Sequence, residues 1–342
     1  MADGQRMSSS LQDVVYGFMP AQILHVAARL GIADVLAGGR RTLAELAAAT
    51  DTHPPSLRRL LHGLTCLDVL TQPDVDTFEL LPAGEQLRAD VPNSIRAAVM
   101  LFCSEAMWRS WSALEYSVRT GNIAWDHVHD ASVFEYMDKH ADEAVTFNSA
   151  MADRTRVVVP EIVASYDFAR FARLVDVGGG NGQLLAKILS AASELRGVVF
   201  DQPAGVVDAA DTLADAGVAD RCEIISGDFF DAVPKGGDAY LLKSVIHNWD
   251  DDKAATILRN CRVAMPVEGT LLLVERVMPA KVESSHGRLV WSDVNMLVNT
   301  HGRERTEAEY RALYTAAGFE LVDVMPISAN PVDYQIVVGR PV

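Results

Sequence analysis

Cysteine is scarce, and the four cysteines of this 342-residue chain are scattered without a Cys-x-x-Cys pair. This spacing predicts neither a zinc site nor a disulfide framework, so we expect reduced thiols in a cytoplasmic protein. No apolar run approaches the ~20 residues that a membrane span needs. The polar stretch from Met1 to Ser10 lacks the apolar core of a signal peptide. No segment repeats at a fixed period.

Positive charge is also in short supply. Lysine and arginine number 30 against 46 acidic residues, which gives a net charge of −16. An acidic surface repels nucleic-acid phosphates, so neither DNA nor RNA is an expected partner. Hydrophobic residues make up 49% of the chain, enough for a buried core, and the length suits two domains of about 100–200 residues each.

Helices are expected in the first third. Ser8 to Ser10 can cap a helix that starts near Leu11. Pro20 then opens a second helix that is apolar nearly all round, which predicts burial, here against another subunit. Thr42-Leu43-Ala44-Glu45 is a capping-box pattern, and a further helix and a hairpin follow. The helix face and the hairpin segments are Leu57, Leu60, Leu61, Leu64, Val69-Leu70 and Phe78-Glu79-Leu80.

Two helices followed by a hairpin form a winged-helix pattern. One interpretation is DNA binding, with Arg58 and Arg59 on the recognition helix. The other is a protein-protein module. We favour the protein-protein module, because two arginines on an acidic chain provide little positive charge for binding DNA.

From about Asn93 to Tyr166 the pattern stays helical and rich in aromatic and methionine side chains. Such residues fill a core, and they also line pockets for flat aromatic ligands, so both roles stay open. The members are Met107, Trp108, Trp111, Phe134, Tyr136, Met137, Phe147 and Met151. The predicted division is 1–92 for the winged helix, 93–165 for linking helices and 166–342 for a catalytic domain.

The sequence pattern changes at Leu174, where short apolar runs begin to alternate with helical segments. This rhythm is typical of an α/β domain with a mostly parallel sheet covered on both faces. Phe319–Val324 and Tyr334–Val338 should form an antiparallel pair at the sheet edge. The expected parallel strands are Leu174–Val177, Gly197–Phe200, Cys222–Ile225, Ala239–Lys243 and Thr270–Glu275.

A glycine-rich turn follows the first of these strands. The GxGxxG dinucleotide fingerprint fails there, because Gln183 or Leu185 stands where its third glycine belongs. The turn instead fits a DxGxGxG loop, in which glycine lets the backbone approach S-adenosylmethionine closely. The four residues of this pattern are Asp176, Gly178, Gly180 and Gly182.

The next two strands also end in polar residues. Asp201, followed by Gln202, can accept hydrogen bonds from ribose hydroxyls. In Gly227-Asp228-Phe229, the acid can accept from an adenine amino group and the ring can pack on the base. Because strand carboxyl ends form the ligand edge of α/β sheets, these residues predict a nucleoside-type cofactor.

His247 follows the fourth strand on the same edge. A histidine with a pKa near 6.5 is a suitable base for a phenol with a pKa near 10. Glu275 ends the fifth strand and Glu304 lies further on, and a carboxylate beside the imidazole would stabilise its protonated form. The alternatives are a structural histidine, a salt bridge at a strand end and a solvated residue near a helix start.

No metal site is expected. The run Asp250-Asp251-Asp252 precedes a helix, where acids favour the positive N-terminus. The segment from Asp126 to Asp130 contains two histidines, and its simplest interpretation is a polar loop.

Three stretches together resemble the caffeic-acid and hydroxyindole O-methyltransferase family, including bacterial relatives that modify antibiotics. They are Leu174–Gly182, Lys243–Asp250 and Glu304-Arg305-Thr306. The resemblance covers nearly the whole chain. It implies a Rossmann-like seven-stranded domain that binds S-adenosylmethionine, an N-terminal winged-helix dimerisation domain, a homodimer and a small aromatic substrate.

The resemblance also assigns residues. It implies His247 as the general base, flanked by Glu275 and Glu304. Cofactor contacts are implied for Gly178, Asp201, Asp228, Phe229 and Lys243. Substrate contacts are implied for Phe147, Met151, Asp293 and Met296, and we add Trp108 from the aromatic-rich helices.

Two departures from the plant members of this family change the expected pocket. Asn248 stands in place of an aspartate, and Arg154 in place of a histidine, so a lignin-type substrate is not expected. Competing functions are N-methylation of a heteroaromatic ring such as a phenazine, a hydroxylase or decarboxylase that binds S-adenosylmethionine, and a winged-helix regulator. His247 favours methyl transfer over the hydroxylase or decarboxylase, and the acidic charge balance argues against the regulator.

Overall fold

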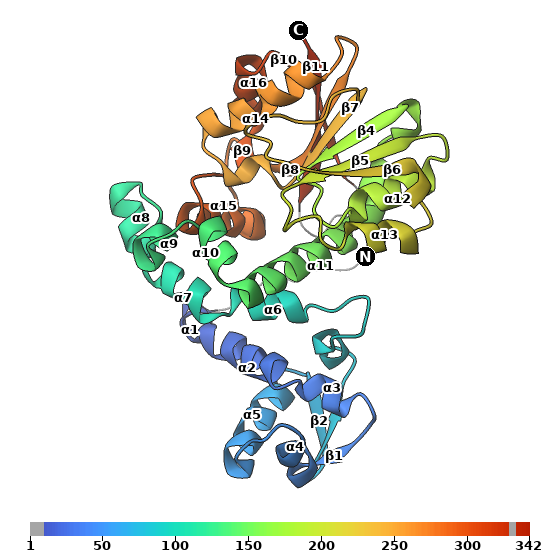
Figure 1. The fold of residues 1–342 in the computed structure, drawn as a ribbon. Helices are drawn as coiled ribbons and strands as arrows, with labels where there is room; N and C mark the ends of the chain where they lie inside the picture. The colour runs from blue at the N-terminus through green and yellow to red at the C-terminus, as the bar shows by residue number, and fades with distance from the viewer. Residues whose placement is uncertain (1–9, 328–332) are drawn as a thin grey trace. The chain divides into compact units, whose positions relative to one another are not determined.

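Two compact units make up the chain in the computed structural model, which describes residues 10–327 and 333–342 (Figure 1). The N-terminal unit comprises the chain up to Arg109 together with Met137–Asp153. The C-terminal unit comprises Ser110–Tyr136 and Arg154–Val342. Over the described residues, no helix is both long and apolar enough to cross a membrane.

The N-terminal unit has the predicted winged-helix order of helices followed by a hairpin. Ser10 caps the first helix through a capping box with Asp13, and Thr42 caps the fourth through a capping box with Glu45. The second helix begins at Phe18, two residues before Pro20, since proline is tolerated in a first helical turn. The elements, with η for a 3₁₀-helix, are α1 Leu11–Tyr16, α2 Phe18–Arg29, α3 Ile32–Leu36, β1 Arg41–Thr42, α4 Leu43–Ala49, α5 Pro54–Cys66, β2 Leu70–Asp74, β3 Thr77–Leu80 and η1 Gly84–Leu87.

Helix α2 is less buried within the chain than its apolar sequence predicts. Only His25, Ala27 and Ala28 are buried on it. Large apolar side chains of α1 and of the start of α2 instead lie at the surface of the single chain. These exposed residues are Leu11, Val14, Val15, Tyr16, Phe18 and Met19.

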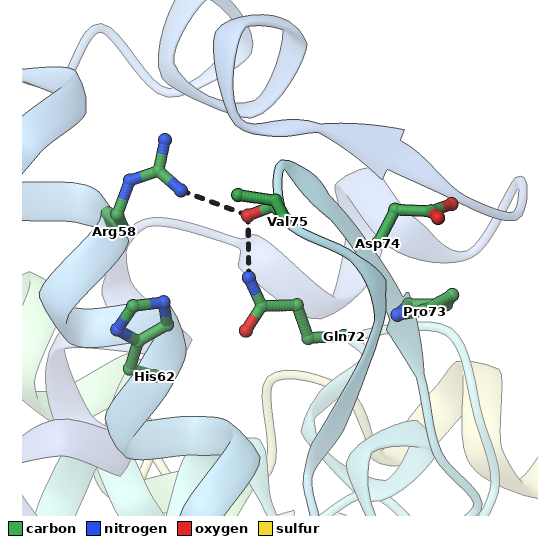
Figure 2. Close-up of a pocket in the computed structure, with 6 residues that line it drawn as sticks. All are labelled: Arg58, His62, Gln72, Pro73, Asp74 and Val75. Atoms are coloured by element: carbon green, nitrogen blue, oxygen red, sulfur yellow. Dashed lines mark hydrogen bonds between the residues drawn. The ribbon is translucent and has the colours of Figure 1, made fainter.

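Arg58 lies on α5, the helix that would read DNA in a winged-helix regulator. Figure 2 shows its guanidinium turned onto the β2–β3 hairpin, where it donates to the carbonyl of Val75 at 3.0 Å. It also forms an ion pair with Asp76. Gln72 donates to the same carbonyl at 2.6 Å. Arg58 and Gln72 therefore both stabilise the turn of the hairpin. The arrangement supports the protein-module interpretation.

The segment from about Asn93 to Tyr166 is helical, as the sequence predicts, and it forms the six helices α6 to α11. The segment expected to be a polar loop, Asp126 to Asp130, was predicted wrongly, because residues 124–129 form a helix. Trp125, buried there, lies 4.3 Å from the His129 ring, and this i,i+4 aromatic contact stabilises the helix. The bounds are α6 Arg96–Phe102, α7 Glu105–Ser112, α8 Leu114–Thr120, α9 Ala124–His129, α10 Val133–Lys139 and α11 Ala141–Ser165.

The C-terminal unit is built on a sheet with the order β10-β11-β8-β7-β4-β5-β6. Five strands, from β8 to the edge strand β6, run parallel, and β11 pairs antiparallel with both β8 and β10. The predicted seven-stranded sheet is thus confirmed, and the two-residue β9, Arg305–Thr306, adds to β8. The other strands are β4 Arg173–Val177, β5 Arg196–Asp201, β6 Cys222–Ser226, β7 Ala239–Lys243, β8 Thr270–Met278, β10 Phe319–Pro326 and β11 Tyr334–Pro341.

Helices cover both faces of this sheet. One face packs against α12, α13 and the end of α11, and the other against α14 and α16. The acidic run opens α14, where Asp250 accepts a hydrogen bond from the Lys253 amide at 2.8 Å. The elements not yet given are α12 Gln183–Ala191, α13 Ala209–Asp215, α14 Asp251–Ala264, α15 Gly287–Asn299, α16 Glu307–Ala316, η2 Phe168–Arg170, η3 Ala219–Arg221, η4 Ile246–Asn248 and η5 Ser284–His286.

Candidate active site

The glycine-rich loop joins β4 to α12 at the carboxyl edge of the sheet. Gly178, Gly180 and Gly182 all have positive φ, at +73°, +56° and +75°. A Cβ at Gly178 would lie 2.7 Å from a methyl group of Val245, so only glycine fits there. A Cβ at Gly180 would meet nothing within 4 Å. The loop therefore leaves an open backbone face that a ligand can approach.

Asp201 ends β5 and braces this loop. One of its carboxylate oxygens accepts the Gly180 amide at 2.8 Å, and the other accepts the Gln202 amide at 2.7 Å. Burial raises the pKa of Asp201, although these two amides oppose the rise. Each oxygen keeps a lone pair for a further donor, such as a ribose hydroxyl.

Asp176 lies beneath the loop, with 2% of its surface exposed. A Cβ on Gly179 would come within 3.0 Å of its carboxylate, so the loop packs directly on it. Burial raises the pKa of Asp176 to about 7, although Lys243 opposes the rise. This residue supports the loop from inside.

The loop after β6 packs its aromatic residues around Trp249. Phe229 and Phe230 meet the indole edge-to-face at centroid distances of 6.1 and 4.8 Å, and Phe134 stacks on it at 5.4 Å. Asp228 accepts the Phe230 amide at 2.8 Å, which shapes the turn. A Cβ on neighbouring Gly227 would lie 2.6 Å from the ring of Phe200.

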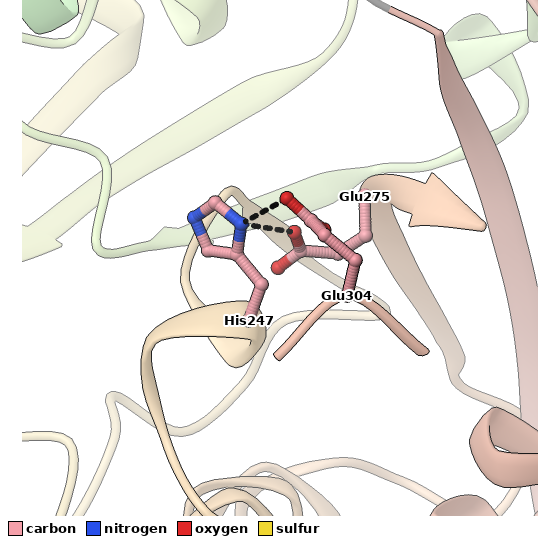
Figure 3. Close-up of side chains that lie close together, drawn as sticks. All are labelled: His247, Glu275 and Glu304. Atoms are coloured by element: carbon pink, nitrogen blue, oxygen red, sulfur yellow. Dashed lines mark hydrogen bonds and ion pairs between the residues drawn. The ribbon is translucent and has the colours of Figure 1, made fainter. Parts of the chain in front are cut away.

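His247 lies in η4, directly after β7, and faces two glutamates (Figure 3). Its Nδ1 is 3.1 Å from Oε1 of Glu304 and 3.9 Å from Oε2 of Glu275. All three side chains are buried. The other ring nitrogen, Nε2, points away from both carboxylates in Figure 3. The structure thus brings together three residues that are widely spaced in the sequence.

The charges of this triad shift its pKa values in opposite directions. Burial opposes charging of His247, but Glu304 and Glu275 raise its pKa above the ordinary value. Burial also opposes ionisation of Glu304, yet His247, Arg276 and Ser292 lower its pKa to about 2. The imidazolium and the Glu304 carboxylate therefore stabilise each other.

Glu275 has a different set of partners. Its Oε1 accepts the backbone amides of Val245 and Ile246 at 2.9 and 2.8 Å, which holds the turn that carries His247. Burial raises the pKa of Glu275. Glu275 is therefore more than the partner in a salt bridge at a strand end. Glu304, with 3% of its surface exposed, is not a solvated residue.

Sequence reasoning missed several residues around the triad. Ser292 donates to Oε1 of Glu304 at 2.6 Å, and Arg276 donates to it at 3.3 Å. Gly302 packs so tightly that a Cβ there would lie 1.8 Å from the carbonyl oxygen of His247. Only Arg276 had a sequence signal, as a charge next to Glu275 in a strand that is otherwise apolar.

His247, Glu275 and Glu304 are also the only set of three possible metal ligands found among the described residues. Arg276 and Ser292 both donate to the glutamate oxygen that faces the imidazole. Such donors suit a hydrogen-bonded triad better than a ligated cation, which would have to compete with a guanidinium.

The predicted substrate residues are divided between the two units. Asp293 on α15 accepts the Glu304 amide at 2.9 Å, and Met296 is buried on the same helix. Trp108, Phe147 and Met151 belong to the other unit, where Trp108 meets Phe18 edge-to-face at 6.4 Å. Lys243 ends β7, with its ammonium 5.6 Å from the ring of Tyr334.

Known proteins resemble this chain along most of its length. Phenazine O-methyltransferase PhzM of Lysobacter antibioticus is 39% identical over 336 residues, 98% of this chain and 97% of that protein. O-demethylpuromycin-O-methyltransferase of Streptomyces alboniger is 41% identical over 317 residues, 91% of this chain and 83% of that protein.

A solved structure agrees with these relatives. The O-methyltransferase NcsB1 from neocarzinostatin biosynthesis, in complex with S-adenosylmethionine and 2-hydroxy-5-methyl naphthoic acid, has a TM-score of 0.83 and 32% identity. The match covers 98% of this chain and all of that one. Residues 12–87 match the model of an O-methyltransferase dimerisation domain, and residues 111–320 match that of an O-methyltransferase domain. The chain therefore belongs to the O-methyltransferase family.

Proposed function

We propose that this protein transfers a methyl group from S-adenosylmethionine to a hydroxyl of a small aromatic natural product, with His247 as general base. One observation carries the proposal. Glu304 binds Nδ1 of a buried imidazole, while Nε2 faces away from both glutamates (Figure 3). That geometry leaves one ring nitrogen for an acceptor hydroxyl.

The loops at the carboxyl edge of the sheet fit the cofactor. The open backbone at Gly180 suits close approach of the methionine part. Asp201 has lone pairs for the ribose, and Asp228 and Phe229 can hold the adenine. Gln202, Gly227 and Lys243 complete this proposed set. When bound, S-adenosylmethionine supplies an electrophilic methyl group and leaves as S-adenosylhomocysteine.

The residues of the chain handle the proton. Nε2 of His247 takes the hydroxyl proton of the acceptor, and the phenolate electron pair forms the new O–C bond. Glu304 stabilises the resulting imidazolium through Nδ1, 3.1 Å away. Glu275 holds the turn at Val245 and Ile246 so that the imidazole stays aimed.

The names of relatives and two features of the chain support the proposed acceptor and assembly. Aromatic natural products appear in the names of relatives, including a phenazine and a naphthoic acid. The proposed substrate contacts are Trp108, Phe147, Met151, Asp293 and Met296. The exposed apolar residues of α1 and α2, within the matched dimerisation domain, form a homodimer interface. The four cysteines are unpaired, as in a reducing cytoplasm.

The test is methyl transfer from labelled S-adenosylmethionine to a panel of phenols, naphthols and phenazines. We compare wild type, His247→Ala and the surface control Glu115→Gln, whose partner Arg119 is equally exposed. Label on oxygen, with a loss of about 10²-fold or more in His247→Ala alone, supports the proposal. Label on nitrogen that survives His247→Ala would instead identify an N-methyltransferase. A folded chain that does not bind the cofactor in calorimetry refutes the proposal.

A further inference from the structure

We propose that Arg276 is a positioning residue for methyl transfer: by binding Glu304, it makes that glutamate, rather than Glu275, the carboxylate partner of His247. This inference rests on the proposed function, in which His247 accepts the proton. It separates two glutamates that look equivalent in the sequence.

Hydrogen-bond geometry distinguishes the two glutamates. Oε1 of Glu304 is 3.1 Å from Nδ1 of His247, within hydrogen-bond reach. The nearer oxygen of Glu275 is 3.9 Å away, which is too long for a hydrogen bond. Glu275 uses its other oxygen for two backbone amides, so its interaction with the imidazole is only through space.

Charge compensation also favours Glu304. A carboxylate with no exposed side-chain surface is stable as an ion only beside a cation or strong donors. Arg276, 3.3 Å from Glu304 and itself 4% exposed, supplies a guanidinium that remains charged when buried. Ser292 adds a short hydrogen bond of 2.6 Å to the same oxygen.

Tyr334 holds Arg276 in place. The two residues are opposite each other in the β8–β11 pairing, and the guanidinium carbon lies 4.7 Å from the centre of the phenol ring. The Tyr334 hydroxyl is 2.7 Å from Oγ of Ser244, three residues before His247. The arginine is therefore fixed by a strand partner before any substrate binds.

The charged and titratable groups around His247 determine the sign of the expected pH effect. The groups that act on His247 directly are Glu304 from the segment before β9, Glu275 from β8 and Tyr334 from β11. Arg276 from β8 acts on Glu304, and Lys243 from β7, Arg276 and Arg154 from α11 act on Tyr334. Removing the cation Arg276 leaves the Glu304 anion to be balanced by His247, which favours the imidazolium. Removing the anion Glu304 does the opposite.

The experiment is a double-mutant cycle on the full chain, with Arg276→Met, Glu304→Gln and both together. Arg276→Met should lower kcat about 10- to 100-fold, while the cofactor Kd and the acceptor KM change by less than about 3-fold. In the Glu304→Gln background the same change should cost less than about 2-fold. Arg276→Lys should recover part of kcat. Arg119→Met removes an exposed arginine and serves as the matched control.

A second measurement does not depend on turnover. Imidazole NMR of the folded protein should show the pKa of His247 moving up in Arg276→Met and down in Glu304→Gln, with a smaller fall in Glu275→Gln. Multiplicative losses in the double variant, shifts in the same direction, or an equal effect of Glu275→Gln would overturn the inference. An inactive wild type with these shifts intact would count against the proposed function alone.

Discussion

Gly302 offers a sharp test of how closely the His247 segment is held. In Gly302→Ala, the new Cβ would start 1.8 Å from the His247 carbonyl oxygen, whereas ordinary contacts begin at 3.4 Å. To reach an ordinary contact, the backbone at Gly302 and the His247 segment must separate by roughly 1.6 Å, which displaces the proposed base from its present position relative to the segment that carries Glu304. Misplacing a reacting group by about 1 Å costs on the order of 100-fold in rate.

We therefore expect kcat of Gly302→Ala to fall at least about 100-fold, equivalent to about 2.7 kcal/mol in the activation barrier. The glycine-rich loop and Asp201 lie at the ends of β4 and β5, away from the β7 segment that leads to His247, so the Kd for S-adenosylmethionine should stay within about 3-fold. Gly287→Ala is the matched control, because its Cβ would make only ordinary contacts of 3.4 Å or more with Trp291. A folded Gly302→Ala enzyme with near-normal kcat would refute the reasoning.

Three further predictions concern the base, the loop and a buried arginine. Because the glutamates raise the pKa of His247 and the base acts when neutral, the acid limb of the kcat/KM profile should lie above pH 6.5. Gly178→Ala should abolish cofactor binding in calorimetry, because its Cβ meets Val245 at 2.7 Å and its φ is positive. Arg305→Met should destabilise the chain by about 3 kcal/mol in urea titration. This fully buried arginine donates to the carbonyls of Ile246 and Trp249. An Arg305→Met protein as stable as wild type would contradict this prediction.

Patterns with a strict local cause were predictable from the sequence. The sheet followed from the alternation of apolar runs and helices. The glycine-rich turn after β4 was predictable because its three pattern glycines adopt positive φ angles that other residues avoid. His247 and Glu275 could be placed on one edge, since parallel strands deliver their carboxyl ends to the same side.

Long-range packing was not predictable from local sequence patterns. Glu304 is 57 residues from His247 in the chain, and only the family resemblance predicted that the two lie together, because nothing local distinguishes a buried acid there from a solvated one. Arg276 has a role only because Tyr334 and Glu304 reach it from later segments. The helix at Asp126 was missed because its stability comes from contacts of Trp125, which its polar neighbours concealed.

The position of β11 bears on how the chain must fold. It pairs with β8 on one side and β10 on the other, although β8 is made some sixty residues earlier. Until Tyr334–Pro341 arrives, β8 presents an apolar strand with unpaired backbone groups, which is a template for intermolecular pairing. Loss of this segment would therefore leave an aggregation-prone protein, and the pairing of β11 protects both this edge of β8 and the surroundings of Arg276.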